Sequence, residues 1–343
     1  MRNVSDITHV CICGSAYALL QYLLLEEEDV IRNHTYYIVG SGIKSEIASR
    51  LPEYTQFETT PCQTLWHKIK RVFVKLNLRY VRNKRFPFMQ AAKIYAQDYL
   101  YPIIAIGQRP YNMLQESPLH MTVNYGKNSQ DLKRVQTHLQ SLSGRLEQRL
   151  YGKVLLSLPA STVQCQKIYL TEPNDSPLLA GKECEILSLA SLWEHSSETK
   201  KDFVRGIFHV SREEVQVPQG SVFLTQPLVD DGILTASEYK ALLDKLFSHY
   251  QSTELCIKVH PRDTYDYSTN FPNFRLMNKP INLELLFLIG WKCDCVISIC
   301  STAVNAVPEG IEVEWYGAEV HPKLSAYFGD TMLPCRKYRK MEL

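Results

Sequence analysis

Short apolar runs alternate with amphipathic stretches through the first part of the chain. Residues 7–13 and Thr35–Val39 have the apolar composition of buried strands, and residues 16–27 have the pattern of a helix. Gly14-Ser15 and the glycine pair around Ser41 are expected turns between them. This strand, helix and strand order predicts the opening of a doubly wound α/β domain.

The pattern is less regular between residue 100 and residue 215. We predict a strand at residues 103–106, a long polar helix at residues 131–150 and a strand at residues 153–158. Pro159, Pro173 and Pro177 then mark a connection, and the charges of residues 181–214 follow no period. We therefore expect a first domain at residues 1–160, a connecting region at residues 161–215 and a second domain at residues 216–343.

The second domain has a clear strand–helix–strand pattern. Residues 221–225 predict a strand, and Thr235 with Glu238 has the spacing of a capping box at the start of a helix. Residues 255–259 alternate as a strand does, and Pro261 ends it because proline has no N–H to donate. The two strands of such a unit are parallel, so the loops that follow them open at one edge of the sheet. Asp230-Asp231 and His260 lie in these loops.

A further unit follows in the same domain. Residues 274–277 predict a strand, Pro280 leads through Glu284 into an apolar helix, and residues 294–300 predict a buried strand. Ser301 and Thr302 then stand before a predicted helix, where hydroxyls and unpaired N–H groups can bind an anion. A simple N-cap is the alternative for Ser301. His321-Pro322 is expected to form only a turn.

Three loops at one sheet edge thus have chemically useful side chains. Arg262 offers a planar fork of donors for a phosphate, and His260 can donate a hydrogen bond near neutral pH. A turn with a structurally paired histidine is the alternative for the His-Pro pair. With a carboxylate pair nearby as general base, the three loops suit group transfer from a phosphorylated donor such as a nucleotide sugar.

Composition excludes several other classes. The 343 residues are 45% hydrophobic with a formal net charge of +2, so no global field favours nucleic acid. Ten cysteines show no metal-ligand spacing and indicate reduced thiols of a cytoplasmic protein. Neither a secretory signal nor a transmembrane run is expected. Gly14 and Gly42 are too sparse for a dinucleotide fingerprint.

Between Glu58 and Asp98 the chain has no acidic residue but several lysines, arginines and aromatic residues. A solvated helix face is one interpretation. The other is a basic surface that meets anionic lipid headgroups at the inner face of the membrane, or a charged glycan acceptor.

Four pieces of the last third of the chain together resemble bacterial sialyltransferases of glycosyltransferase family 52, which act on capsular polysaccharide or lipooligosaccharide. The pieces are residues 224–232 with Asp-Asp-Gly, residues 258–267 with His-Pro-Arg-Asp, Pro280 with Glu284, and Ser301-Thr302-Ala303. The resemblance implies a GT-B fold of two facing Rossmann-like domains with parallel sheets, the first on the acceptor side and the second binding the nucleotide sugar.

The resemblance also implies roles for individual residues in an inverting, metal-independent transfer from CMP-sialic acid, without a cofactor. Asp231 or Asp230 would deprotonate the acceptor hydroxyl, with Glu116 as a reserve candidate. His260 would assist departure of the CMP phosphate, which Ser301 and Thr302 would hold. Pro261, Arg262, Pro280 and Glu284 complete the expected donor site.

The expected partners are this donor, a glycan acceptor that ends in galactose, and a second copy of the chain. Two rival interpretations remain open: the same fold with a UDP- or GDP-hexose donor, and a non-catalytic glycan-binding protein.

Overall fold

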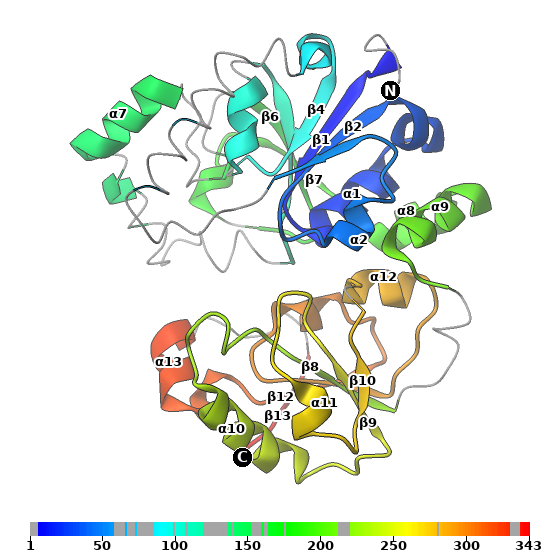
Figure 1. Ribbon diagram of the computed structural model, residues 1–343, viewed down its shortest axis with the longest axis vertical. Coiled ribbons are helices and arrows are strands. Elements are labelled where there is room, and N and C mark those ends of the chain that lie inside the picture. The colour runs from blue at the N-terminus through cyan, green and yellow to red at the C-terminus, as the bar shows by residue number, and fades with distance from the viewer. Residues whose placement is uncertain are drawn as a thin grey trace. The chain divides into compact units, whose positions relative to one another are not determined.

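The computed structural model describes residues 6–57, 66, 73, 86–98, 100–106, 109–118, 133, 136–138, 140–151, 159–160, 164–174, 176–211, 220–279, 281–329 and 337–343. The chain divides into two compact units, Met1–His209 and Val210–Leu343. Each unit is built on one parallel sheet with helices packed around it (Figure 1). The fold class is therefore α/β with two parallel sheets, as the sequence predicted.

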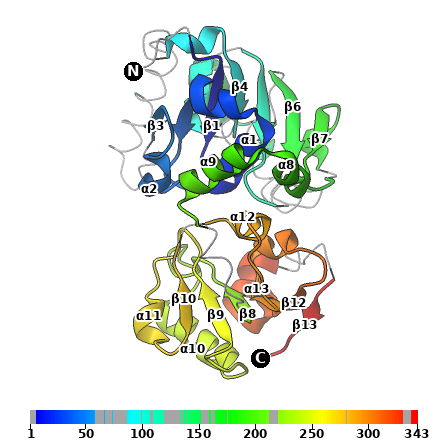
Figure 2. The same ribbon diagram turned by 90° about the vertical axis from the view of Figure 1, so that its right-hand side faces the viewer.

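The first unit has seven strands in the order β3-β2-β1-β4-β5-β6-β7. The strands are β1 (His9–Cys13), β2 (Thr35–Val39), β3 (Tyr54–Gln56), β4 (Lys93–Ala96), β5 (Tyr111–Leu114), β6 (Cys165–Leu170) and β7 (Glu183–Ile186). The α-helices are α1 (Ala16–Leu25), α2 (Ser45–Ala48), α7 (Leu142–Tyr151), α8 (Leu189–His195) and α9 (Glu198–Phe208). Helix α1 packs on β1 and α8, and α9 packs on α2 (Figure 2). The predicted β1, α1 and β2 are confirmed.

The strand expected at residues 103–106 is wrong, because these residues belong to the 3₁₀ helix η4 (Tyr101–Ile106). They are 0–1% exposed, and a short apolar run that is buried on every side has no period to distinguish a strand from a helix. The strand that pairs with β1 on the side away from β2 is β4. Of the predicted helix at residues 131–150, the structure describes α7 and a few residues before it, whereas residues 153–158 and most of the basic stretch lie outside the described residues.

The expected connecting region at residues 161–215 contains β6, β7, α8 and α9. All four elements belong to the first unit, which ends at His209. The sequence pattern was unclear here because β7 is an edge strand whose four residues are all exposed. An edge strand without a buried face shows no alternation of apolar and polar residues.

A buried carboxyl group in the first unit gives a testable pH dependence. Asp98 follows β4, is 2% exposed, and accepts hydrogen bonds from the Tyr111 hydroxyl (2.6 Å) and the Ala160 N–H (2.8 Å). Burial raises the pKa of Asp98 to about 6. Because this pKa is about 3.9 in an unfolded chain, folding favours the protonated form, and the stability it contributes is lost as pH rises through 6.

We therefore expect the free energy of unfolding of the parent to fall by about 2 kcal/mol relative to that of Asp98→Asn between pH 4.5 and pH 8. Urea unfolding of both proteins at the two pH values measures this difference. The substitution also changes the hydrogen bonds with Tyr111 and Ala160, and this alters the free energy of unfolding by an amount that does not depend on pH. Only the change of the difference with pH is therefore informative. Parallel pH dependences would contradict the assignment.

The second unit has six strands in the order β10-β9-β8-β11-β12-β13. The strands are β8 (Ser221–Leu224), β9 (Leu255–Lys258), β10 (Arg275–Met277), β11 (Cys295–Ser298), β12 (Glu312–Trp315) and β13 (Arg339–Lys340). The α-helices are α10 (Ala236–Phe247), α11 (Tyr267–Asn270), α12 (Leu283–Leu288) and α13 (Pro322–Phe328). The capping box of Thr235 and Glu238 is present at α10, and the predicted β8–α10–β9 unit is confirmed.

None of the helices in the described ranges is long and apolar enough to span a membrane.

Candidate active site

The predicted site residues lie at the carboxyl edge of the second sheet. Strand β8 pairs with β9 on one side and β11 on the other, and Leu224 is in register with both Lys258 and Ser298. The loops after the three strands therefore begin side by side, with β9 and β11 about 10 Å apart. The strand order reverses at β8, and such a switch point is where open α/β sheets bind ligands.

The loop that begins at His260 is bonded to the end of β8. The His260 N–H donates to Thr225 Oγ1 (2.9 Å), and that hydroxyl donates to Asp263 Oδ2 (2.7 Å). The Tyr267 hydroxyl donates to the same oxygen (2.7 Å). Burial raises the pKa of Asp263, although these two hydrogen bonds favour its ionised form. The Asp263 carboxylate is therefore used within the protein, where it fixes the loop to the end of β8.

This loop sets the tautomer of His260. The Arg262 N–H donates to His260 Nδ1 at 3.1 Å, so a neutral imidazole has its hydrogen on Nε2. The Nε2–H group is then a hydrogen-bond donor. His260 itself is half-buried at the sheet edge. The arrangement can stabilise an anion next to the loop.

The two carboxylates of the Asp-Asp-Gly turn differ in their partners. Asp230 accepts hydrogen bonds from the Thr264 N–H (2.8 Å) and hydroxyl (2.5 Å), so it ties the two loops together. Asp231 pairs with Arg262 through both of its oxygens, at 3.1 and 3.4 Å. This ion pair is solvent-exposed, and each oxygen keeps a lone pair for another donor. Of the two, Asp231 is better placed to accept a proton from a bound hydroxyl.

The loop after β11 is bonded to the loop after β8. Gln226 Nε2 donates to the Cys300 carbonyl (3.0 Å), and Cys300 Sγ donates to Gln226 Oε1 (2.6 Å). Ser301 is 7% exposed, and its hydroxyl accepts from the Ala303 N–H at 3.4 Å as the N-cap of the five-residue 3₁₀ helix η7 (Thr302–Ala306).

The N-cap interpretation of Ser301 is therefore confirmed. A helix this short has little dipole, so an anion here depends on the hydroxyl groups of Ser301 and Thr302.

Glu284 lies in the first turn of α12 and is half-buried, next to the buried ammonium of Lys258. Pro280 lies outside the described residues. Sequence reasoning missed Thr225, Gln226 and Lys258 as residues that shape this site. A signal was present for each: two polar residues directly follow an apolar strand, and a charged residue interrupts another.

The first unit has its own switch point, between β1 and β4, and a side chain fills it. Gln97 Oε1 accepts hydrogen bonds from the N–H groups of Gly14 and Ser15, the second at 3.1 Å. These amides would otherwise be available to a phosphate. Glu116 lies after β5, and its carbonyl accepts from the Ser15 hydroxyl at 2.8 Å.

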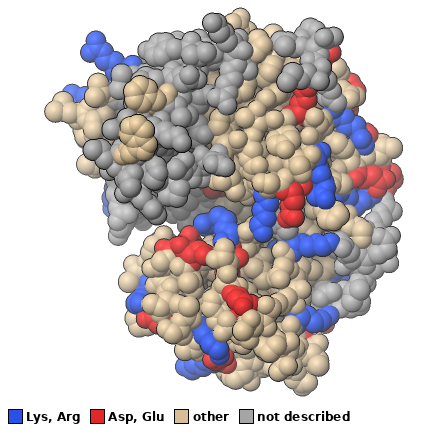
Figure 3. All heavy atoms as spheres, viewed as in Figure 1, with Lys and Arg blue, Asp and Glu red and all other residues tan. Residues whose placement is uncertain are grey.

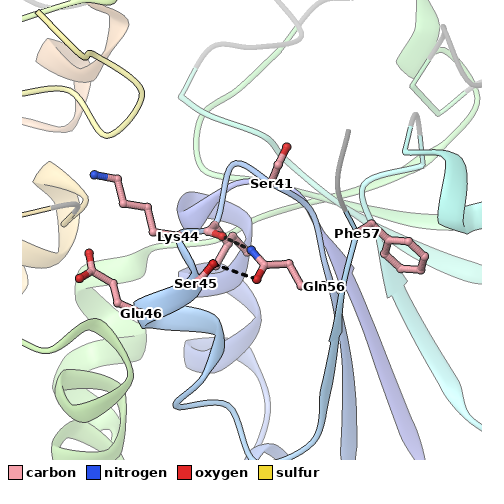
Figure 4. A pocket seen from close by; sticks show the side chains of 7 residues that line it. Ser41, Lys44, Ser45, Glu46, Gln56 and Phe57 are labelled. Atoms are coloured by element: carbon pink, nitrogen blue, oxygen red, sulfur yellow. Dashed lines mark hydrogen bonds between the residues drawn. The ribbon is translucent and has the colours of Figure 1, made fainter. Parts of the chain in front are cut away.

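A hollow of about 670 Å³ lies at the carboxyl ends of β2 and β3 in the same unit (Figure 4). Gln56 is held in it by the Ser45 hydroxyl (3.3 Å) and the Ile43 carbonyl (2.7 Å). The ammonium of Lys44 and the carboxylate of Glu46 extend away from Gln56 and Ser45 (Figure 4). The lining combines hydroxyl, amide and charged groups with an aromatic residue: Ser41, Ile43, Lys44, Ser45, Glu46, Gln56 and Phe57.

Charges of both signs are interspersed on the described part of the face shown in Figure 3. In the parts of the chain that the structure describes, no group of three histidine, cysteine or acidic side chains could hold a metal ion. Metal independence itself stays a prediction.

Comparison with known proteins agrees with this architecture. The model of glycosyltransferase family 52 matches residues 141–324. An uncharacterised protein of Haemophilus influenzae is 33% identical over 190 residues, which span 53% of this chain and 60% of that protein.

Two solved structures show the fold at low sequence identity. A 2,6-sialyltransferase of Photobacterium sp. JT-ISH-224, in a complex with CMP and lactose, has a TM-score of 0.59 at 12% identity over 91% of this chain and 71% of its own. The GT-B domain of a Photobacterium damselae sialyltransferase has a TM-score of 0.53 at 10% identity over 95% and 96%. The fold is thus that of GT-B enzymes, and because the family model matches more than half of its length, the chain belongs to glycosyltransferase family 52.

Proposed function

We propose that this protein is an inverting, metal-independent sialyltransferase that moves sialic acid from CMP-sialic acid to a hydroxyl of a cell-surface glycan. Family membership and the sialyltransferase-like fold support glycosyl transfer of this kind. The observation on which the proposal depends is the arrangement at the β8 switch point. There the Nε2–H of His260 and the Asp231–Arg262 pair lie on loops that are bonded to each other.

The chemistry of the donor fits these groups. Loss of CMP leaves an oxocarbenium-like carbon that is already next to a carboxylate, so the leaving phosphate mainly needs charge stabilisation. His260 would donate to it from Nε2, and the hydroxyls of Ser301 and Thr302 would bind its other oxygens. Asp231 would accept the proton of the attacking hydroxyl on a free lone pair, while Arg262 holds the carboxylate in place.

Nucleotide selectivity tests the donor part of the proposal. A ligand that binds only the folded chain raises its melting temperature. CMP and CDP should stabilise the protein in a thermal-shift assay, whereas UDP and GDP at the same concentration should not. Stabilisation by UDP or GDP and none by CMP or CDP would favour a hexose donor instead.

We further propose that the acceptor binds the first unit, at the hollow beside β2 and β3. Hydroxyl, amide and aromatic groups are what sugars contact, and the volume is sufficient for a small oligosaccharide.

Ser41→Tyr should obstruct this hollow without changing the nucleotide site. We expect the KM for a galactose-terminated acceptor to rise by about tenfold, which corresponds to the loss of a contact worth about 1.4 kcal/mol. Hydrolysis of CMP-sialic acid without acceptor should stay at the parent rate. Ser49→Tyr, directly after α2 and outside the hollow, is the matched control. An unchanged acceptor KM in Ser41→Tyr would remove the hollow from the acceptor site.

A further inference from the structure

A buried lysine lies beside the candidate site and has no part in the reaction as described so far. Lys258 is the last residue of β9 and is 6% exposed. Its ammonium donates a hydrogen bond to the carbonyl oxygen of Ile281, 2.8 Å away. Removing an ammonium ion from water costs several kcal/mol. An apolar side chain would therefore suit this position better if it only filled the core.

The surroundings of Lys258 explain how the charge is tolerated. Glu284, in the first turn of α12, faces it and favours the ammonium form, and Cys256 on the same strand does so more weakly. Its neighbours in register on β8 and β10 are the uncharged Leu224 and Met277. Burial has the larger effect and lowers the pKa of Lys258 to about 8.

The hydrogen bond from Lys258 acts on the segment between β10 and α12. The Val259 N–H donates to the Met277 carbonyl (3.0 Å) where this segment begins. Ile281, which Lys258 binds, is three residues before Glu284, and His260 is two residues after Lys258. One side chain therefore joins the start of the His-Pro loop to the start of α12.

On the basis of the proposed function, we propose that Lys258 is a positioning residue of the nucleotide pocket. Its ammonium holds Ile281 against the end of β9 and so presents the Glu284 carboxylate to the ribose hydroxyls of CMP. A carboxylate accepts hydrogen bonds from two adjacent hydroxyls, the pairing that dinucleotide-binding α/β folds use for ribose. Lys258 does not touch the nucleotide, so it changes donor affinity and leaves the chemical step nearly unchanged.

The pocket should then respond to pH in a defined window. Lys258 is protonated below pH 8 and loses its charge above it, which removes the attraction to Glu284. The phosphate of CMP has its second pKa near 6, so the nucleotide keeps one charge state between pH 7.5 and pH 9.5. The parent should bind CMP several-fold more weakly at pH 9.5 than at pH 7.5.

Calorimetric titration with CMP and with 2′-deoxy-CMP tests the proposal. Lys258→Met keeps most of the length of the side chain and removes its charge. The variant should bind CMP about tenfold more weakly at pH 7.5, show no further loss at pH 9.5, and lose the parent's preference for CMP over 2′-deoxy-CMP, while kcat stays within about threefold. Lys245→Met, at an exposed position of α10, should behave as the parent.

A double-mutant cycle separates positioning from a general loss of stability. If Lys258 acts through Glu284, the effects of Lys258→Met and Glu284→Gln on the Kd for CMP should be strongly non-additive. Additive effects, or an unchanged Kd in Lys258→Met, would overturn the proposal.

Two further outcomes keep the test decisive. If Lys258→Met does not fold, a parent Kd for CMP that is constant from pH 7.5 to pH 9.5 overturns the proposal without the variant. Failure of the proposed function is distinct, because the parent itself would then bind UDP or GDP rather than CMP.

Discussion

Asp231→Asn should slow glycosyl transfer by roughly a hundred- to ten-thousand-fold, the effect of removing a general base. In the parent, Arg262 contacts both oxygens of the Asp231 carboxylate. The amide of the variant keeps the shape of this group and one acceptor for Arg262. The Kd for CMP should therefore remain close to that of the parent.

Asp230→Asn is the matched control, because Asp230 is adjacent in sequence but has a structural role. Its carboxylate accepts both hydrogen bonds from Thr264, so the variant should lose stability and keep much of its transfer activity. If Asp230→Asn or Glu116→Gln abolishes transfer while Asp231→Asn does not, the base is assigned to the wrong residue. If all three variants stay active, no side-chain carboxylate acts as the base.

His260→Ala should reduce both transfer and the slow hydrolysis of CMP-sialic acid by water, on the order of hundreds-fold. The imidazole Nδ1 accepts the Arg262 N–H, so the lost group is the Nε2–H donor to the departing phosphate. Asp231→Asn should affect hydrolysis much less, which separates the two ends of the reaction. Measuring CMP release with and without acceptor for both variants gives all four rates.

The second His-Pro pair provides an unusually close control. His321 Nδ1 accepts the Lys323 N–H at 3.2 Å, the same local contact as in the His260 loop, but it caps α13. His321→Ala should therefore cost about 1 kcal/mol of stability, as for other lost caps, with transfer unchanged. If the two alanine variants lose transfer equally, His260 only stabilises a turn.

The elements around the site were predictable because local sequence determines them. The capping box at Thr235 fixes the start of α10, and the apolar spacing fixes its buried face. Strand β9 ends at Lys258, shortly before Pro261, as the sequence indicated. The parallel pairing of β8 and β9 followed from the short connection through one helix. These features place Asp231 and His260 at one sheet edge from sequence alone.

The pairing of side chains across loops was not predictable. Asp231 and Arg262 are 31 positions apart, and their contact depends on the exact path of two turns. In the sequence Lys258 is only the polar member of an alternating strand, yet its side chain is buried and bonded to the Ile281 carbonyl in the segment before α12. In the first unit, the four-residue β4 and the exposed β7 offered too little pattern for prediction.

Release of CMP from CMP-sialic acid, with EDTA present and with and without a galactose-terminated acceptor, tests the central claim most directly. We predict slow release without acceptor, a large acceleration with acceptor, and a sialylated product in equal amount to the CMP released. No release of CMP under either condition, together with consumption of a UDP- or GDP-hexose in a parallel reaction, would contradict it.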